Sequence, residues 1–210
     1  MNTHALLSKY DVPAPRYTSY PTVPYWSDSP STAQWLSALN QGFAEAPMVP
    51  WSLYIHTPFC ESLCSFCGCN TSITKNHDKE DPYIDHLHRE FSLYREQVSG
   101  FGHQPLREIH LGGGSPTWFS AASLTRMVES ILKQVTIDHQ HFEGAVEVDP
   151  RRGTVEQLKA LHSLGFRRLS LGVQDFDPET QRLINRIQPY ELTREVYDRA
   201  RSVGYQSINF

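Results

Sequence analysis

Residues 51–69 read Trp-Ser-Leu-Tyr-Ile-His-Thr-Pro-Phe-Cys60-Glu-Ser-Leu-Cys64-Ser-Phe-Cys67-Gly-Cys69 and hold all four cysteines of the 210-residue chain. Cysteines that act as small apolar core residues scatter along a sequence, so this concentration indicates a metal or cluster site. Residues 51–56 predict a short strand, and the cysteine loop follows it. We therefore expect the loop at the carboxyl end of a strand.

A strand-then-helix rhythm begins at residue 51 and continues to the last residue. Five strands that alternate with helices predict a parallel sheet with right-handed crossovers. The fold class is therefore α/β, with the active site expected at the carboxyl ends of the strands, as in α/β barrels. The pattern predicts strands at 51–56, 106–111, 144–148, 168–172 and 206–210, and helices at 81–97, 121–135, 155–164 and 192–203.

Residues 1–50 stand apart from this rhythm as an amino-terminal arm and helix. The segment Arg16-Tyr-Thr-Ser-Tyr-Pro-Thr22 is neither helical nor alternating, and it predicts an ordered extended arm. Residues 31–44 predict a helix. At the other end, the strand at 206–210 has no following helix, so we interpret the chain as the amino-terminal portion of a longer protein.

Composition excludes several functional classes. The net charge is −4 and no long basic run is present, so nucleic acid is not the expected partner. No segment approaches the roughly 20 apolar residues that cross a bilayer, and the first residues lack the apolar stretch of a signal peptide. Clustered cysteines without an export signal argue for a reducing compartment, so we expect a cytoplasmic location with no membrane partner.

The cysteine spacing selects among metal sites. Thiolates from Cys60, Cys64 and Cys67 can hold three irons of a [4Fe–4S] cube and leave the fourth iron open. Structural zinc usually takes two ligand pairs separated by a longer stretch, which this sequence lacks. Zinc and a redox role without metal are the alternatives. Cys69 lies one residue beyond Cys67, which makes ligation of the same cube awkward, so we leave it outside the ligand set.

Other chemistry-bearing residues follow later strands. The segment Gly112-Gly-Gly-Ser-Pro116 lets a cofactor approach the backbone closely, or forms an ordinary tight turn. Glu147 suits ribose hydroxyls or a cationic group, or is a solvated strand end. Gln174 offers an amide to a polar ligand, and Arg186 offers a carboxylate clamp or is a solvated helix end. Among the ten histidines, only His56, just before the cysteine loop, is a candidate for function.

The three-and-two cysteine spacing resembles that of the radical S-adenosylmethionine enzymes, in which this loop follows the first strand of a partial barrel. The resemblance implies a partial (β/α)6 TIM-like barrel, with about five of its six strands in this chain. It also implies that the open iron chelates the amino and carboxylate groups of S-adenosylmethionine. An electron from the cluster then cleaves the sulfonium to methionine and a 5′-deoxyadenosyl radical.

Several segments together resemble one family, the oxygen-independent coproporphyrinogen III oxidases (dehydrogenases) of heme biosynthesis. Cys69 and the amino-terminal arm are its more specific marks. Members of that family are roughly twice as long, so the resemblance implies that residues 51–210 are a truncated barrel without the carboxyl-terminal domain. The segments that carry the resemblance are Lys9–Thr22, Cys60–Asn70, Gly112–Thr117, Glu147–Pro150 and Leu171–Phe176.

The resemblance implies roles for individual residues. Two S-adenosylmethionine molecules are expected, and we take Tyr54 and His56 as the catalytic candidates. The cluster ligands are Cys60, Cys64 and Cys67; the first S-adenosylmethionine contacts Tyr54, Gly113 and Glu147; the second contacts Phe66, Gly114, Ser115, Gln174 and Arg186; and Arg16, Tyr17 and Tyr20 belong to an arm that closes over the porphyrinogen.

The implied reaction is the oxidative decarboxylation of two propionates of coproporphyrinogen III to vinyl groups, which gives protoporphyrinogen IX. The implied partners are the porphyrinogen and an electron donor such as a flavodoxin or ferredoxin, with a monomeric enzyme at full length. A heme-chaperone or heme-degrading methyltransferase relative shares the cysteine loop and is the nearest alternative. A heme carrier without turnover is an alternative from a different class.

Overall fold

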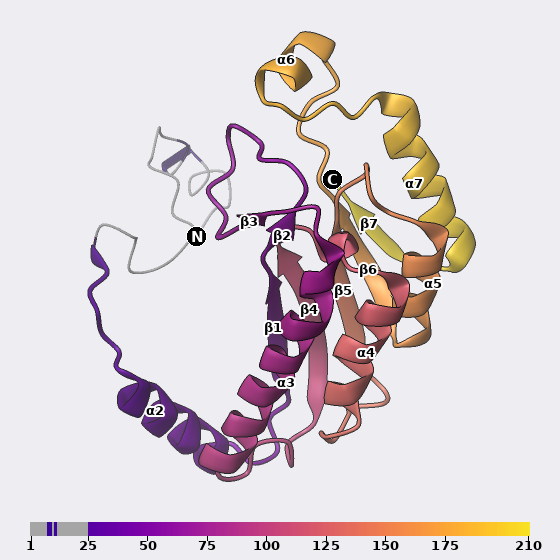
Figure 1. Ribbon diagram of the computed structural model, residues 1–210. Coiled ribbons are helices and arrows are strands. Elements are labelled where there is room, and N and C mark those ends of the chain that lie inside the picture. The colour runs from indigo at the N-terminus through magenta and orange to yellow at the C-terminus, as the bar shows by residue number, and fades with distance from the viewer. Residues whose placement is uncertain (1–7, 10, 12–24) are drawn as a thin grey trace. The chain divides into compact units, whose positions relative to one another are not determined.

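Figure 1 shows the computed structural model, which describes residues 8–9, 11 and 25–210. The predicted arm with Arg16, Tyr17 and Tyr20 lies outside the described residues, so its role stays a prediction. The chain divides into two compact units, Met1–Leu39 and Asn40–Phe210, a division that falls before the boundary predicted at residue 50. Helix α2 (Thr32–Glu45), predicted at 31–44, runs across this division.

The larger unit is built on a five-stranded sheet in which all neighbouring strands are parallel. The strand order in the sheet follows the order in the chain, which is what successive strand–helix units of one hand produce. This sheet confirms the predicted α/β partial barrel. Its strands are β1 (Trp51–Thr57), β4 (Leu106–Gly113), β5 (Glu143–Val148), β6 (Phe166–Leu171) and β7 (Ser207–Asn209).

Helices that follow the strands cover one face of the sheet (Figure 1). Alternate strand residues point toward these helices and form the core, where burying each such side chain contributes about 1.5–3 kcal/mol. The helices are α3 (Glu80–Gln97), α4 (Ala121–Leu132), α5 (Val155–Ser163) and α7 (Tyr190–Val203), and the buried strand residues are Ile55, Ile109, Leu111, Val146, Val148, Leu169 and Leu171.

The intervening strand residues are polar and more exposed. Arg168 of β6 reaches across β5 to Glu108 of β4, at 3.3 Å, and also pairs with Glu143, at 3.1 Å. Nearer the carboxyl ends, His110 pairs with Glu147 at 3.2 Å. This second face is therefore suited to polar ligands, with its functional candidates nearest the carboxyl ends of the strands.

Local signals account for the helix boundaries. Thr154 begins α5 with a capping box, in which its hydroxyl accepts from the Gln157 amide and the Gln157 side chain accepts in return. Two glycines follow helices in the left-handed region, Gly165 after α5 with φ of 96° and Gly204 after α7 with φ of 115°. Glycine adopts this conformation without strain, which is why it is a common residue after the end of a helix.

Helix α6 (Pro178–Leu183) and the two short strands of the cysteine loop were not predicted. The helix is polar and only six residues long, so it has no apolar periodicity to find. Strands β2 (Phe59–Cys60) and β3 (Ser72–Ile73) pair in parallel and bring the two ends of the cysteine loop together. Among the described residues, no helix is both long and apolar enough to cross a membrane.

Candidate functional site

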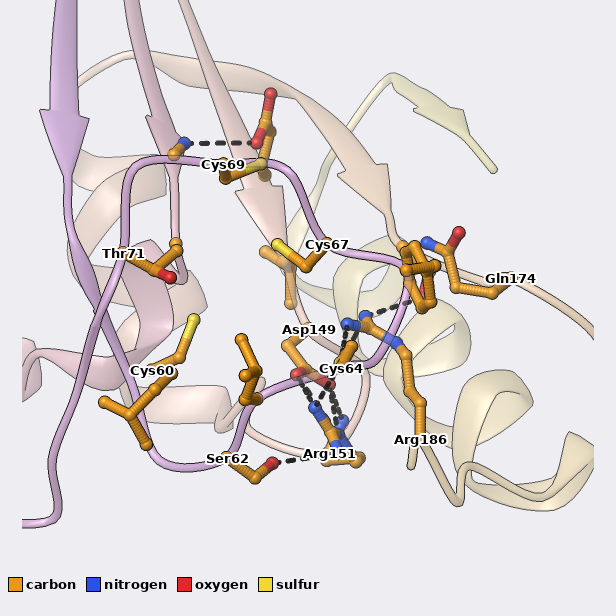
Figure 2. A pocket seen from close by; sticks show the side chains of 18 of the residues that line it. Cys60, Ser62, Cys64, Cys67, Cys69, Thr71, Asp149, Arg151, Gln174 and Arg186 are labelled. Carbon is orange, nitrogen blue, oxygen red and sulfur yellow. Dashed lines mark hydrogen bonds and ion pairs between the residues drawn. The ribbon is translucent and has the colours of Figure 1, made fainter. Parts of the chain in front are cut away.

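A pocket of about 200 Å³ lies at the carboxyl ends of the strands (Figure 2). It gathers most of the residues that the sequence nominated, although they are far apart in the chain. Tyr54, His56 and Ser115 lie outside its lining. The predicted residues that line it are Cys60, Cys64, Phe66, Cys67, Gly113, Gly114, Glu147, Gln174 and Arg186.

One part of the cysteine loop is tied to the turn after α6. The side-chain amide of Asn185 donates to the carbonyl of Leu63 at 2.7 Å, and the Ser65 amide donates to the carbonyl of Ile184 at 3.0 Å. Asn185 has φ of 55°, a left-handed conformation that asparagine tolerates better than most residues. This turn therefore fixes the chain on both sides of Cys64.

The other part of the loop is tied to β1 and to an aromatic cluster. His56 Nε2 donates to the carbonyl of Asn70 at 2.7 Å, so Nδ1 is free to accept from the Tyr54 hydroxyl at 3.1 Å. Trp118 Nε1 donates to the carbonyl of Thr74 at 2.9 Å. The ring of His56 thus anchors the end of the loop, and its predicted catalytic role stays a prediction.

The segment at the end of β4 needs glycine for two reasons: its backbone turns, and it approaches the neighbouring chain closely. A Cβ at Gly113, whose φ is 112°, would lie 2.7 Å from the His56 ring. A Cβ at Gly114 would lie 2.9 Å from the backbone of Pro58 and Phe59. These glycines let β4 end against β1, and both line the pocket with partly exposed backbone.

Glu147 forms a wall of the pocket near these glycines. Its carboxylate accepts from the Gly113 amide at 3.3 Å and from His110 at 3.2 Å. Tyr54 packs beside His110, with 5.6 Å between ring centroids. Partial burial, together with the charges of Glu147 and Cys69, raises the pKa of the Tyr54 hydroxyl above its usual value.

Two of the thiols, those of Cys60 and Cys69, lie in surroundings that disfavour the thiolate form. Burial raises the pKa of the Cys60 thiol to about 11, and the nearby Cys67 and Asp149 add to the effect. Burial and a hydrogen bond with Cys67 also raise the pKa of Cys69. Cysteine ligands bind metals as thiolates, so a metal must displace these protons when it binds.

Asp149 and Arg151 also belong to the site; Asp149 lies in the segment Glu147–Pro150 named from the sequence, whereas Arg151 was not singled out. Arg151 Nη2 lies 2.6 Å from Asp149 Oδ2, and its Nη1 lies 3.5 Å from Ser62 Oγ. Both residues line the same pocket as the cysteines. The only sequence signal for Arg151 was its position, since it closely follows a strand whose end already carried Glu147 and Asp149.

The donor set fits a cluster better than a single ion. In the part of the chain that the structure describes, no three His, Cys, Asp or Glu side chains meet closely enough to hold one metal ion. A cube needs no such meeting, because each cysteine binds a different iron. Cys60, Cys64 and Cys67 are all free and face one cavity, which matches this requirement.

Comparison with known proteins extends these observations. The family model for the radical SAM superfamily matches residues 54–210. The chain is 40% identical over 205 residues to the oxygen-independent coproporphyrinogen III oxidase of Salmonella typhimurium, covering 98% of this chain and 43% of that protein. The enzyme of the same name from Helicobacter pylori strain J99 is 40% identical over 204 residues, covering 97% and 44%.

A solved structure, coproporphyrinogen III oxidase (HemN) from Escherichia coli, described as a radical SAM enzyme, is also similar. It matches with a TM-score of 0.81 and 37% identity, over 97% of this chain and 44% of that chain. The chain thus spans less than half the length of the relatives that it matches. With the superfamily pattern running over residues 54–210 and three free cysteines after its first strand, the chain belongs to the radical SAM superfamily, whose members bind a [4Fe–4S] cluster and S-adenosylmethionine.

Proposed function

We propose that this chain carries the cluster- and S-adenosylmethionine-binding barrel of an oxygen-independent coproporphyrinogen III oxidase. The observation that carries the proposal is the pocket, in which three free cysteines share a cavity with the backbone of Gly113 and the side chain of Glu147. The similarity to enzymes of that name extends over 98% of this chain, so it includes the residues of the pocket.

In this proposal Cys60, Cys64 and Cys67 ligate the cluster. Gly113 and Glu147, with Tyr54, bind the first S-adenosylmethionine, since an exposed backbone and a carboxylate suit an amino group and ribose hydroxyls. The residues assigned to a second molecule are Phe66, Gly114, Ser115, Gln174 and Arg186, of which Ser115 is buried outside the cysteine pocket.

When bound, the cluster and S-adenosylmethionine supply the radical that removes hydrogen from a propionate side chain. The protein positions the groups and shields them from water, which is the usual division of labour in cofactor enzymes. Loss of carbon dioxide and of one further electron leaves a vinyl group, and two such rounds convert coproporphyrinogen III to protoporphyrinogen IX. A low-potential donor of the flavodoxin or ferredoxin type and a cytoplasmic location complete the proposal.

The test is anaerobic reconstitution of the full chain with iron and sulfide, followed by measurement of bound iron, bound sulfide and 5′-deoxyadenosine. We expect brown protein that cleaves S-adenosylmethionine under reduction, and loss of both properties in Cys64→Ala. Cys69→Ala is the matched control, since this residue lies outside the proposed ligand set, and its iron and sulfide content should persist.

Incubation with coproporphyrinogen III then tests the substrate. Formation of protoporphyrinogen IX supports the proposal. Methylated or opened heme would indicate a heme-degrading methyltransferase, and transfer of intact heme would indicate a chaperone. Heme binding without cleavage of S-adenosylmethionine would indicate a carrier. Stoichiometric zinc without sulfide, or unchanged cleavage in Cys64→Ala, would overturn the cluster assignment.

A further inference from the structure

The three proposed ligand thiols have unequal surroundings. Cys64 is only 7% exposed, and two guanidinium groups reach its sulfur: Arg186 Nη1 at 3.6 Å and Arg151 Nη2 at 4.0 Å. Within the described residues, neither Cys60 nor Cys67 has an arginine hydrogen bond of this kind. One corner of the cluster site is therefore distinguished by nearby positive charge.

Arg151 is held firmly in this position (Figure 2). Its Nε lies 3.0 Å from Asp149 Oδ1 and its Nη2 lies 2.6 Å from Asp149 Oδ2, the two-point pairing that fixes a guanidinium plane. Its side chain is only 22% exposed, and that of Asp149 is 11% exposed. Burial alone would raise the pKa of Asp149, but the bonds and charges of Arg151 and Arg186 lower it, so the carboxylate is ionised.

We infer that Arg151 and Asp149 are an oppositely charged pair that sets the reduction potential of the cluster, and that they act through the sulfur of Cys64. The inference rests on the proposed cluster ligands and goes beyond them, because it assigns a role to two residues that bind neither iron nor substrate in that proposal. Arg151 is a positioning and electrostatic residue here, not a catalytic one.

The direction of each effect follows from charge. Reduction adds one negative charge to the cluster, and a cationic donor at a ligating sulfur stabilises the reduced form and raises the potential. The carboxylate of Asp149 opposes this effect and also holds the guanidinium in place. Because the pair is largely buried, solvent screens it less than it would screen a surface pair. Removing the two partners should therefore shift the potential in opposite directions.

Arg151 is a better probe than Arg186. Arg186 also donates to the Gly172 carbonyl at 2.8 Å and is proposed to contact S-adenosylmethionine, so its loss would change several properties together. Arg152 offers a matched control, since it is the next residue and carries the same charge. Its side chain is 45% exposed and pairs with Glu61 rather than with a cysteine.

The experiment is a potentiometric titration of the reconstituted full chain with dithionite and mediators, with the reduced cluster followed by electron paramagnetic resonance. At a fixed potential, we expect the ratio of reduced to oxidised cluster to fall about tenfold in Arg151→Gln, or about 59 mV for a one-electron couple. It should rise in Asp149→Asn. Arg152→Gln should move it by less than about a third as much, because its charge is screened by solvent.

Arg151→Lys keeps the charge and should retain most of the wild-type potential, and Arg151→Met, which also removes the charge, replaces Arg151→Gln if that variant does not fold. An unchanged potential in the variant that removes the Arg151 charge, shifts of the same sign for that variant and Asp149→Asn, or an equal shift in Arg152→Gln would each overturn the inference. A wild-type chain that takes up no cluster would overturn the proposed function as well. A wild-type cluster with unaffected variants overturns this inference alone.

Discussion

The two halves of the cysteine loop are held by different physical means. We call the segment Leu63–Ser65, with its contacts to Asn185 and Arg151, the arginine side. We call the segment Asn70–Thr74, with its contacts to His56 and Trp118, the aromatic side. Hydrogen bonds and charges hold the arginine side, and its backbone contacts are exposed. The aromatic side continues into the core, where Trp118 is 3% exposed.

This difference predicts that one side of the loop affects the stability of the fold and that the other affects the properties of the cluster. A buried ring loses many contacts when it is removed, so the aromatic side is expected to determine the stability of the barrel. Exposed hydrogen bonds contribute little to stability, but they fix where Cys64 presents its sulfur. Substitutions on the aromatic side should therefore lower the free energy of unfolding, while those on the arginine side should change cluster properties in a chain that remains folded.

The largest effect is expected for Trp118→Ala. The ring lies 4.6 Å from that of Phe59 and stacks on His77 at 4.5 Å, and its Nε1 donates to the carbonyl of Thr74. Its loss should lower the free energy of unfolding by about 3–5 kcal/mol, the usual cost of removing a buried aromatic side chain. Chemical denaturation followed by circular dichroism measures this change.

Trp118→Phe is the matched control, because it keeps much of the ring packing and removes the donor to Thr74. Its cost should be smaller, and the difference between the two variants reports how much of the effect comes from packing. Equal costs for Ala and Phe would show that the hydrogen bond, and not the aromatic cluster, secures this side of the loop.

Much of the fold follows from periodicity in the sequence. Strand β5 was predicted at 144–148 and spans Glu143–Val148, because the β-branched Val146 and Val148 alternate with Glu147 just before the turn residue Pro150. Helix α6 was missed because its stability comes from an Asp177 cap and from tertiary contacts rather than from an apolar face. The cap itself, an Asp before Pro178, was the one available signal.

Several of the nominated residues that line one pocket have positions that are determined by strand ends. Glu147, Gln174 and the glycine segment were nominated because parallel strands bring their carboxyl ends together. Arg151 was missed and Asn185 was given no role, because their partners Cys64 and Leu63 are 87 and 122 residues away in the chain. A contact of that separation depends on packing that no local pattern records.

An intermediate effect is expected for Glu80→Gln, which probes the polar support of the aromatic side. The Glu80 carboxylate accepts from Ser120 Oγ at 2.9 Å and pairs with His77 at 2.8 Å, next to Trp118. Burial alone would raise the pKa of Glu80, but hydrogen bonds from Ser123, His77 and Ser120 outweigh it and lower the pKa. The substitution should cost about 1.5–3 kcal/mol at neutral pH, as for hydrogen bonds to charged groups.

The pH dependence of this cost follows from the lowered pKa. The ionised carboxylate stabilises the folded chain fully above its ordinary pKa of 4.5, and this contribution is lost as the pH falls through the lower folded value. Unfolding measured from pH 7 down to pH 3 should show the wild-type and Glu80→Gln curves converging below about pH 4.5. A constant difference over this range would contradict the role of the charge.

The smallest effect on stability, with a clear effect on the cluster, is expected on the arginine side at Asn185. Asn185→Gly accepts the positive φ and loses only the donor to Leu63, whereas Asn185→Asp also places a carboxylate oxygen against the Leu63 carbonyl. Both should lower the free energy of unfolding by less than about 1.5 kcal/mol, the upper contribution of one ordinary hydrogen bond. Iron release to a chelator should nevertheless become roughly twofold to tenfold faster, since 1.4 kcal/mol corresponds to tenfold.

The relative rates of iron release in the two Asn185 variants distinguish a specific hydrogen bond from a general loosening of the turn. If the Asn185 amide holds the loop, Asn185→Asp should release iron faster than Asn185→Gly, because repulsion replaces attraction at the Leu63 carbonyl. If only backbone conformation matters, Asn185→Gly should equal the wild type, since glycine adopts positive φ without strain. Iron release that tracks the loss of unfolding free energy in both variants, and in Glu80→Gln, would show that the two sides of the loop are not separable.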